Sequence, residues 1–383
     1  MPVPFPGPNE VLLTPPDAAE VQAIGCGVAS VVAGPSGLTP LQRTLIEAFL
    51  PAMTAHGVDV GAFWPETPHD LAVTLAPRNL AFRTRVVQLM LLCALVLRPL
   101  PEEVAGQVSE AARELCVDEG MVDVAREFAD GSLGLAALDF DRNGYSAEWN
   151  ATDAEMLHAS KSLASAWDVS VTDPALAERW QALTELPPGT LGRGVSDLYE
   201  ARGFTYPGTP GSAPPLLAQH DWVHVLADYG TTVESEIEVF GLIARANDDM
   251  RAFSLLAMVI SLFETGYLRA GAGLFQSSPG HLTADPNLAV RLSDAMRRGA
   301  LCHDQVTDSD SIDFLRVDWF DLAAMEVAEA RARFSLVDKS SGATTAGSVG
   351  PWEPGGISPF QMNAGRQLAA RLGRNYDPWG AAP

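Results

Sequence analysis

Helix start signals followed by apolar residues at helical spacing are the feature that most restricts the fold of this chain. Thr39-Pro40 and Thr67-Pro68 each place a capping residue directly before a proline at the first helical position. The apolar residues that follow recur every three or four positions, as on one face of a helix. Similar patterns cover Arg78 to Leu97, Pro101 to Leu115 and Asp118 to Asp130. The sequence therefore predicts an all-α fold.

The helical pattern divides into two blocks and a tail. The predicted organisation is a Pro-rich lead over 1–34, a helical domain over 35–148, a second helical domain over 149–338 and a tail over 339–383. Residues 340–360 are rich in Gly, Ser, Thr and Pro with little to bury, a composition that favours a flexible linker. A short amphipathic stretch, Pro359 to Leu372, follows it. We therefore predict that the tail is flexible apart from this stretch.

The overall charge restricts the partners of the protein. A formal net charge of −23 argues against binding to nucleic acid, which needs clustered Lys and Arg. The longest apolar runs, Val86 to Leu97 and Ala252 to Phe263, are too short to span a bilayer, which needs roughly 20 residues. The first residues lack the basic and apolar regions of a secretory signal. We expect a cytoplasmic protein whose contact with the inner membrane face, if any, is peripheral.

Two histidines and two carboxylates share a spacing typical of metal ligands. His220 and His224 are four residues apart, so on a helix they lie on one face, where imidazole pairs meet one cation. Asp221 adjoins that face. Glu236 lies twelve residues beyond His224, which on one continuous helix would separate them by about 18 Å. The helix must therefore break if Glu236 is to join the site.

Gly230 offers the place for that break. Glycine readily takes the left-handed conformation that ends a helix, and Thr231 to Glu234 has the spacing of a capping box that starts another. His224 lies six residues before Gly230 and Glu236 six after it, so a hairpin would bring both to the same level. We therefore predict that the second domain contains a helical hairpin that binds one divalent metal. Imidazole and carboxylate ligands favour Zn over Fe, Mn or Mg.

The same residues resemble a known family signature. His220-Asp221-Trp222-Val223-His224, followed by eleven residues and Glu236, resembles the His-Asp-x-x-His-x11-Glu signature of the coenzyme Q (ubiquinone) biosynthesis protein Coq-four family. Similarity around Thr190 to Arg193 and Asp318-Trp319 extends the resemblance over about 150–335. The resemblance implies a metal site at these residues, an isoprenoid or prenylated aromatic ligand, and decarboxylation or hydroxylation at an aromatic ring carbon.

Three functions stay open on the sequence. In the first, a metal-dependent (oxidative) decarboxylase uses Asp221 or Glu234 as proton acceptor beside the metal. In the second, a non-catalytic module binds isoprenoid lipid or organises a biosynthetic complex, and the metal only holds the hairpin together. In the third, a zinc hydrolase uses the motif as zinc proteases use His-Glu-x-x-His. The run Ala252 to Phe263 would line a prenyl tunnel or form plain core.

The N-terminal block has a resemblance of its own. Over about 35–145, the order of Leu38 to Arg43, Val87 to Leu92 and Pro101 to Val104 resembles the TerB-like tellurite-resistance helical domain. We expect protein partners to bind through this domain and the tail, and the chain to form a homo-oligomer. Asp139 to Gly144 resembles the opening of a calcium-binding loop, but Asn150 replaces its final Glu, so a solvated turn is the better interpretation.

Overall fold

The computed structural model describes residues 15–97, 101–117, 172–210, 215–247 and 287–379, together with residues 212, 253, 256, 260, 283 and 285. Within these residues the secondary structure is helical, with isolated bridges but no strand. The predicted all-α fold is confirmed. The expected helix from Asp118 to Asp130 and the turn from Asp139 to Gly144 lie outside the described residues.

Among the described residues, the N-terminal block contains five α-helices: α1 (Ala18–Val32), α2 (Pro40–Thr54), α3 (Pro68–Leu75), α4 (Leu80–Leu95) and α5 (Glu102–Glu114). The two predicted helix starts are confirmed. Thr39 forms a capping box with Gln42, and Thr67 forms one with Asp70. Each side chain satisfies a backbone N–H that the first turn of a helix leaves without a partner.

Helix α1 differs from the prediction, because it lies inside the segment expected to be a Pro-rich lead. Asp17 caps it by accepting a hydrogen bond from the Glu20 backbone at 2.9 Å. The helix crosses α3 closely, since a Cβ added to Gly27 would lie 2.7 Å from Leu71 Cδ1. Residues 18–32 of the predicted lead therefore form a helix that joins the core.

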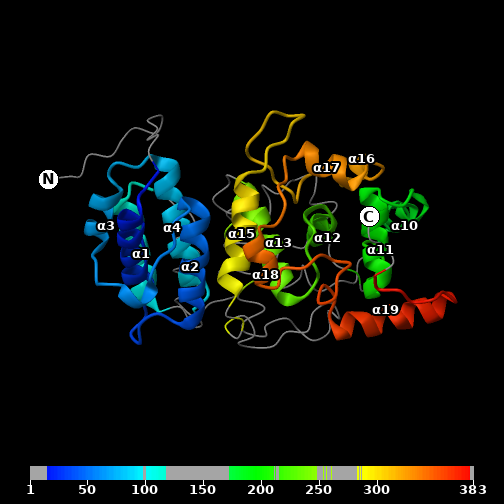
Figure 1. Ribbon diagram of the computed structural model, residues 1–383, viewed down its shortest axis with the longest axis horizontal. Helices are drawn as coiled ribbons and strands as arrows, with labels where there is room; N and C mark the ends of the chain where they lie inside the picture. Colours follow the sequence, from blue (N-terminus) through cyan, green and yellow to red (C-terminus); the bar gives the residue numbers. More distant parts are fainter. Residues whose placement is uncertain are drawn as a thin grey trace.

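From residue 172 onward the structure describes α10 (Pro174–Ala182), α11 (Leu191–Arg202), α12 (Pro215–Ala227), α13 (Val233–Ala246), α15 (Leu288–Ala300), α16 (Trp319–Leu322), α17 (Val327–Arg333), α18 (Ser341–Thr345) and α19 (Pro359–Leu372). Helices α15, α13, α12 and α11 follow one another along the long axis, away from the N-terminal block (Figure 1). Among the described residues, no helix is both long and apolar enough to cross a membrane.

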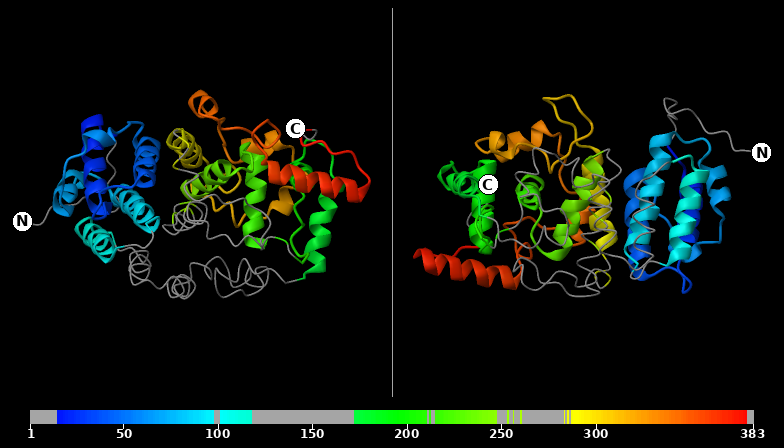
Figure 2. Two further views of the ribbon diagram at one scale, coloured as in Figure 1. Left: turned by 90° about the horizontal axis from the view of Figure 1, so that it is seen from below. Right: turned by 180° about the vertical axis from the view of Figure 1, so that it is seen from behind.

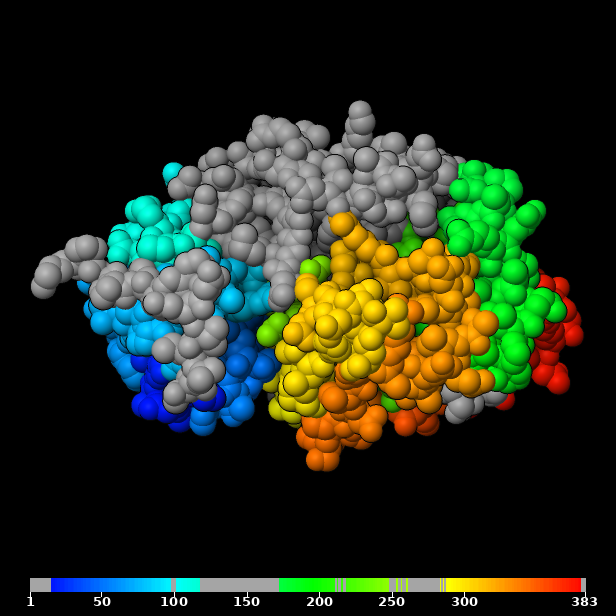
Figure 3. Space-filling model, turned by 90° about the horizontal axis from the view of Figure 1, so that it is seen from above, coloured from blue at the N-terminus to red at the C-terminus, as the bar shows by residue number. Residues whose placement is uncertain are grey.

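The N-terminal block packs against this second group of helices (Figures 2 and 3). Helix α2 lies on α15, and the ring of Phe49 lies 5.1 Å from that of Phe253. Arg85 of α4 covers the same Phe253 ring and donates to the Asn247 carbonyl at 3.2 Å. The predicted domain boundary at 148/149 falls outside the described residues and stays a prediction, as does the TerB-like resemblance.

The tail differs from the flexible segment that its composition predicts. Trp352 and Ile357 are buried, and Gln361, in the first turn of α19, is 2% exposed. Helix α19 lies against α11 so closely that a Cβ on Gly365 would meet the Ala201 carbonyl oxygen at 2.1 Å. The predicted amphipathic stretch from Pro359 to Leu372 forms α19 with the same bounds. The segment from 340 to 358 is packed on the helices instead of linking free parts.

Candidate metal centre

The chain turns between α12 and α13, and the residue in the left-handed conformation at this turn differs from the prediction. Asp228, with φ 62°, takes the left-handed conformation predicted for Gly230. The glycine is required for a different reason, because a Cβ on Gly230 would lie 2.5 Å from Gly356 Cα. Helix α13 has Thr232 as its N-cap residue, with no capping hydrogen bond from its side chain. The predicted capping box over Thr231 to Glu234 is therefore wrong.

The reversal brings the four predicted ligand residues together. Oε2 of Glu236 lies 3.2 Å from Nε2 of His220 and 3.2 Å from Nε2 of His224. Oδ1 of Asp221 lies 3.4 Å from Nε2 of His220. One ligand atom from each of the histidines and Asp221 falls within 4.8 Å of the others. Glu236 is not part of that compact triad, but the pair distances place it directly against both imidazoles.

These distances suit a bound cation. In a tetrahedral zinc site with bonds of about 2.0–2.1 Å, neighbouring ligand atoms lie about 3.3 Å apart. The separations here are 3.2 and 3.4 Å. His224 and Glu236 are 0% and 1% exposed, and their facing Nε2 and Oε2 atoms form no hydrogen bond. Buried polar atoms without hydrogen bonds are rare, and a cation between them would satisfy both. The residues present therefore fit a divalent metal.

A backbone carbonyl fixes the proton on His224. Nδ1 of His224 lies 2.7 Å from the carbonyl oxygen of Gly230. Because a carbonyl oxygen only accepts, Nδ1 must carry the hydrogen, and the neutral ring then keeps its lone pair on Nε2. Metal-binding histidines almost always have such a partner, which orients the ring and raises its basicity. The tautomer of His224 is therefore the one that binds a metal through the nitrogen facing Glu236.

Tyr199 of α11 holds the carboxylate of Asp221 through the oxygen that does not face His220. The Tyr199 hydroxyl donates a hydrogen bond to Oδ2 of Asp221, so Oδ1 is the oxygen that faces His220. Burial raises the pKa of Tyr199 well above its ordinary value, and the Asp221 charge raises it further. Burial also raises the pKa of Asp221, against the opposing effect of the histidines. Nothing local in the sequence links these two residues, which lie on different helices.

Glu236 remains a carboxylate in this setting. Burial alone would raise its pKa, but without a metal the protonated form of the neighbouring imidazoles, His224 first, attracts the carboxylate and lowers its pKa to about 2. An ionised carboxylate buried between two imidazoles is a strong ligand for a divalent cation.

Glu234, the other predicted proton acceptor, is not brought to the cluster. Two residues on a helix are separated by about 200° around the axis, so Glu234 and Glu236 lie on opposite sides of α13. Glu238, one turn after Glu234, pairs with Arg291 of α15 at 2.7 Å. Burial lowers the pKa of Arg291, while Glu238 and then Glu234 raise it. Glu234 therefore lies on the same side of α13 as Glu238 and away from Glu236, and its role as a proton acceptor stays a prediction.

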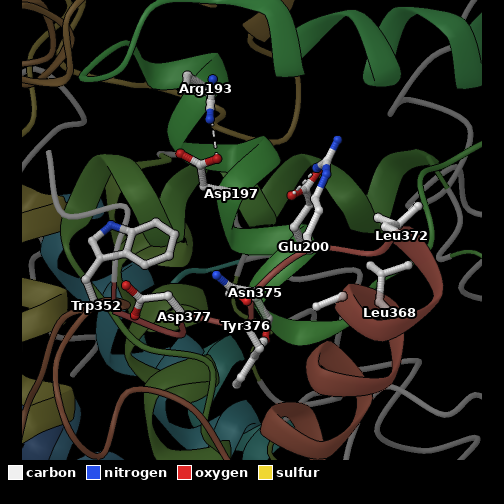
Figure 4. A pocket seen from close by; sticks show the side chains of 12 residues that line it. Arg193, Asp197, Glu200, Trp352, Leu368, Leu372, Asn375, Tyr376 and Asp377 are labelled. Atoms are coloured by element: carbon white, nitrogen blue, oxygen red, sulfur yellow. Dashed lines mark hydrogen bonds and ion pairs between the residues drawn. The ribbon is translucent and has the colours of Figure 1, made fainter.

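A cavity of about 240 Å³ lies elsewhere, between α11, α19 and the chain that follows α19 (Figure 4). Its charged groups are largely paired with one another: Arg193 with Asp197 at 2.8 Å, and Arg374 with Glu200 at 2.7 Å. None of the predicted ligand residues lines it. The cavity is therefore separate from the candidate ligand residues.

Comparisons with known proteins add little to this picture. No protein-family model matches the chain, and no curated protein matches it. A solved structure from Nostoc punctiforme PCC 73102, described as a "putative ubiquinone biosynthesis protein", aligns with 57% of this chain and 96% of its own. The identity is 19% and the TM-score is 0.28. A similarity of this size carries no inference about function.

Proposed function

We propose that the chain is a metal-dependent protein of quinone or prenylated-aromatic metabolism, with zinc as the favoured metal. The ligands are His220, His224, Glu236 and Asp221. The observation that supports the metal is the convergence of two buried imidazoles on one ionised carboxylate at 3.2 Å. The class of ligand, an isoprenoid or prenylated aromatic compound, rests on the sequence motif shared with the coenzyme Q biosynthesis family.

The chemistry of this proposal divides between the metal and Asp221. A bound divalent metal supplies a Lewis acid that polarises an oxygen of an aromatic acid. Tyr199 holds Oδ2 of Asp221, so Oδ1 is left to bind the metal or to accept a proton from the substrate. The reaction proposed is decarboxylation at a ring carbon, in which CO₂ leaves and a proton takes its place; hydroxylation at that carbon would in addition need dioxygen as the oxidant and a redox-active metal such as iron.

Burial favours a second candidate, in which the metal only holds α12 to α13 and the protein binds its lipid without turnover. The four ligand residues are between 0% and 7% exposed. Structural zinc sites are closed in this way, whereas catalytic sites keep an open position for water or substrate.

Elemental analysis tests the metal site. The parent protein, its His220→Ala/Glu236→Ala variant and a His69→Ala control are purified from cells grown without added metal. His69 is an exposed histidine paired with Glu114. We expect near one equivalent of zinc or iron in the parent and in the control, and none in the double variant. Equal metal content in all three proteins would show that these residues do not form the site.

Turnover separates the two candidates. The probe is a prenylated 4-hydroxybenzoate, and the assay measures the CO₂ released from it by the parent and by Asp221→Asn. Activity that Asp221→Asn abolishes while the metal is retained supports the enzyme. Binding of the probe by the metal-loaded parent without any release of CO₂ supports the non-catalytic module.

A further inference from the structure

The segment from 349 to 361, here named the C-terminal strap, lies against the connection between α12 and α13. The backbone N–H of Gly230 donates to the carbonyl of Val349 at 2.9 Å. The backbone N–H of Thr231 donates to the carbonyl of Gly356 at 2.8 Å. Two consecutive residues of the connection are therefore bonded to a segment more than a hundred positions later in the chain.

One of these bonds leads directly to a metal ligand. The Thr231 N–H and the Gly230 C=O belong to the same peptide unit, which is planar and rigid. One edge of this unit is fixed by Gly356 at 2.8 Å, and the other presents its oxygen to Nδ1 of His224 at 2.7 Å. The position of the strap therefore sets the direction of the carbonyl that orients His224.

Gln361 extends this control to the start of α13. Its side-chain amide donates to the Thr231 carbonyl at 2.9 Å, and its side-chain oxygen accepts from the Thr231 hydroxyl at 2.9 Å. The next residue, Thr232, is the N-cap of α13, and its carbonyl accepts from the Glu236 backbone at 2.9 Å. The strap thus fixes the peptide units that lead to both His224 and Glu236.

Arg202, at the end of α11, joins the strap to the connection. It is 1% exposed, and its Nε donates to the Thr231 hydroxyl at 2.6 Å. Its Nη2 donates to the carbonyls of Pro351 at 2.7 Å and Gly356 at 3.1 Å. One buried guanidinium therefore forms hydrogen bonds with both the strap and the α12–α13 connection.

We propose that the C-terminal strap positions the metal ligands, with Gln361 and Arg202 as positioning residues. The inference rests on the proposed metal site. In this proposal, the strap holds the ring of His224 and the first turn of α13 at the distance from each other that binding of one divalent cation requires. Loss of the strap contacts would loosen the metal without touching a ligand.

The test is a titration with Co²⁺, whose visible absorption reports the geometry of its ligands, on full-length Gln361→Glu. Glutamate keeps the side-chain oxygen that caps α19 through Ser358 at 3.0 Å, but it cannot donate to the Thr231 carbonyl. The control is Gln367→Glu, which adds the same charge at an exposed position of the same helix. Arg202→Lys serves as a second strap variant, because lysine keeps the charge but not the forked donors.

We expect one Co²⁺ in the parent and in Gln367→Glu with the same spectrum. Both strap variants should bind Co²⁺ about 10-fold more weakly or worse, as losses of outer partners of metal ligands typically do, with an altered spectrum. Unchanged affinity and spectrum in both strap variants would overturn the strap proposal and leave the metal site standing. Absence of Co²⁺ binding in the parent would instead refute the metal site itself.

Discussion

The close contact of Gly230 with Gly356 yields a prediction whose size follows from the structure. In Gly230→Ala, the new Cβ would lie 2.5 Å from Gly356 Cα and 2.7 Å from the Gly356 oxygen. Ordinary carbon contacts are about 3.5–4.0 Å, so the connection and the strap must separate by about 1 Å. Both neighbours are backbone and cannot rotate away, so the peptide units themselves must shift.

Two measurable losses follow from a shift of about 1 Å. Overpacking of this kind typically reduces the free energy of unfolding by about 1–3 kcal/mol. The hydrogen bond from His224 to the Gly230 carbonyl, now 2.7 Å, would lengthen beyond the range in which it holds. Removal of such an outer partner lowers metal affinity about 10–100-fold. Gly230→Ala should therefore lose both stability and metal.

Urea unfolding of the protein after a chelator has removed its metal measures the loss of stability. A competitive zinc titration measures the loss of metal affinity. The matched control is Gly342→Ala in α18, where the nearest atom to the new Cβ is Ser340 Oγ at 3.7 Å. There the substitution should be neutral or stabilise by up to about 1 kcal/mol. If Gly230→Ala unfolds within about 0.5 kcal/mol of the parent and binds zinc equally well, the close contact does not hold the connection in place.

Three further predictions concern the second carboxylate, acid stability and the N-terminal block. Tyr199→Phe removes the donor to Asp221 and should weaken zinc binding about 10-fold, measured by competition with a chromophoric chelator, while the helical circular dichroism stays unchanged. Because the pKa of Glu236 is lower in the folded than in the unfolded protein, its ionised carboxylate stabilises the metal-free fold at pH values above 4.5, the ordinary pKa of glutamate. This contribution disappears as the pH falls to about 2. The stability difference between the metal-free parent and Glu236→Gln should therefore shrink over that range, from at most about 3 kcal/mol; a constant difference in urea titrations would contradict it. Gln42→Met should destabilise the protein by about 2–3 kcal/mol in thermal unfolding, because the buried amide donates to the carbonyls that end α1 and α4 at 2.7 and 3.0 Å.

The sequence predicted the helices best where a local signal fixes their ends. Thr39 and Thr67 cap their helices as expected, because the capping bond forms within four residues and needs no tertiary partner. Helix α1 was missed because its two glycines and four valines are weak helix formers, and its Gly27 is used for close contact with Leu71. Such a contact depends on a neighbour that the local pattern does not reveal.

The convergence of the candidate ligand residues was predicted from their spacing, but the reasons given for it were only partly right. His220 and His224 share a helix face, and the reversal returns Glu236 to them, as the symmetry about Gly230 indicated. The left-handed residue, however, is Asp228. Glycine is needed at 230 because Gly356 lies against it, and no pattern within the hairpin contains that information.

The tail shows why hydropathy was a poor guide to order in this protein. A segment with little apolar surface reads as flexible, because burial of apolar side chains is the usual source of stability. The strap is held mainly by polar groups instead: backbone carbonyls of Val349 and Gly356 accept from the α12–α13 connection, and buried Arg202 donates to Pro351. Its glycines allow backbone to approach backbone, as the Gly230–Gly356 contact shows. A composition typical of a linker therefore serves here to bring the backbone of the strap within hydrogen-bonding distance of the α12–α13 connection, beside the candidate ligand residues.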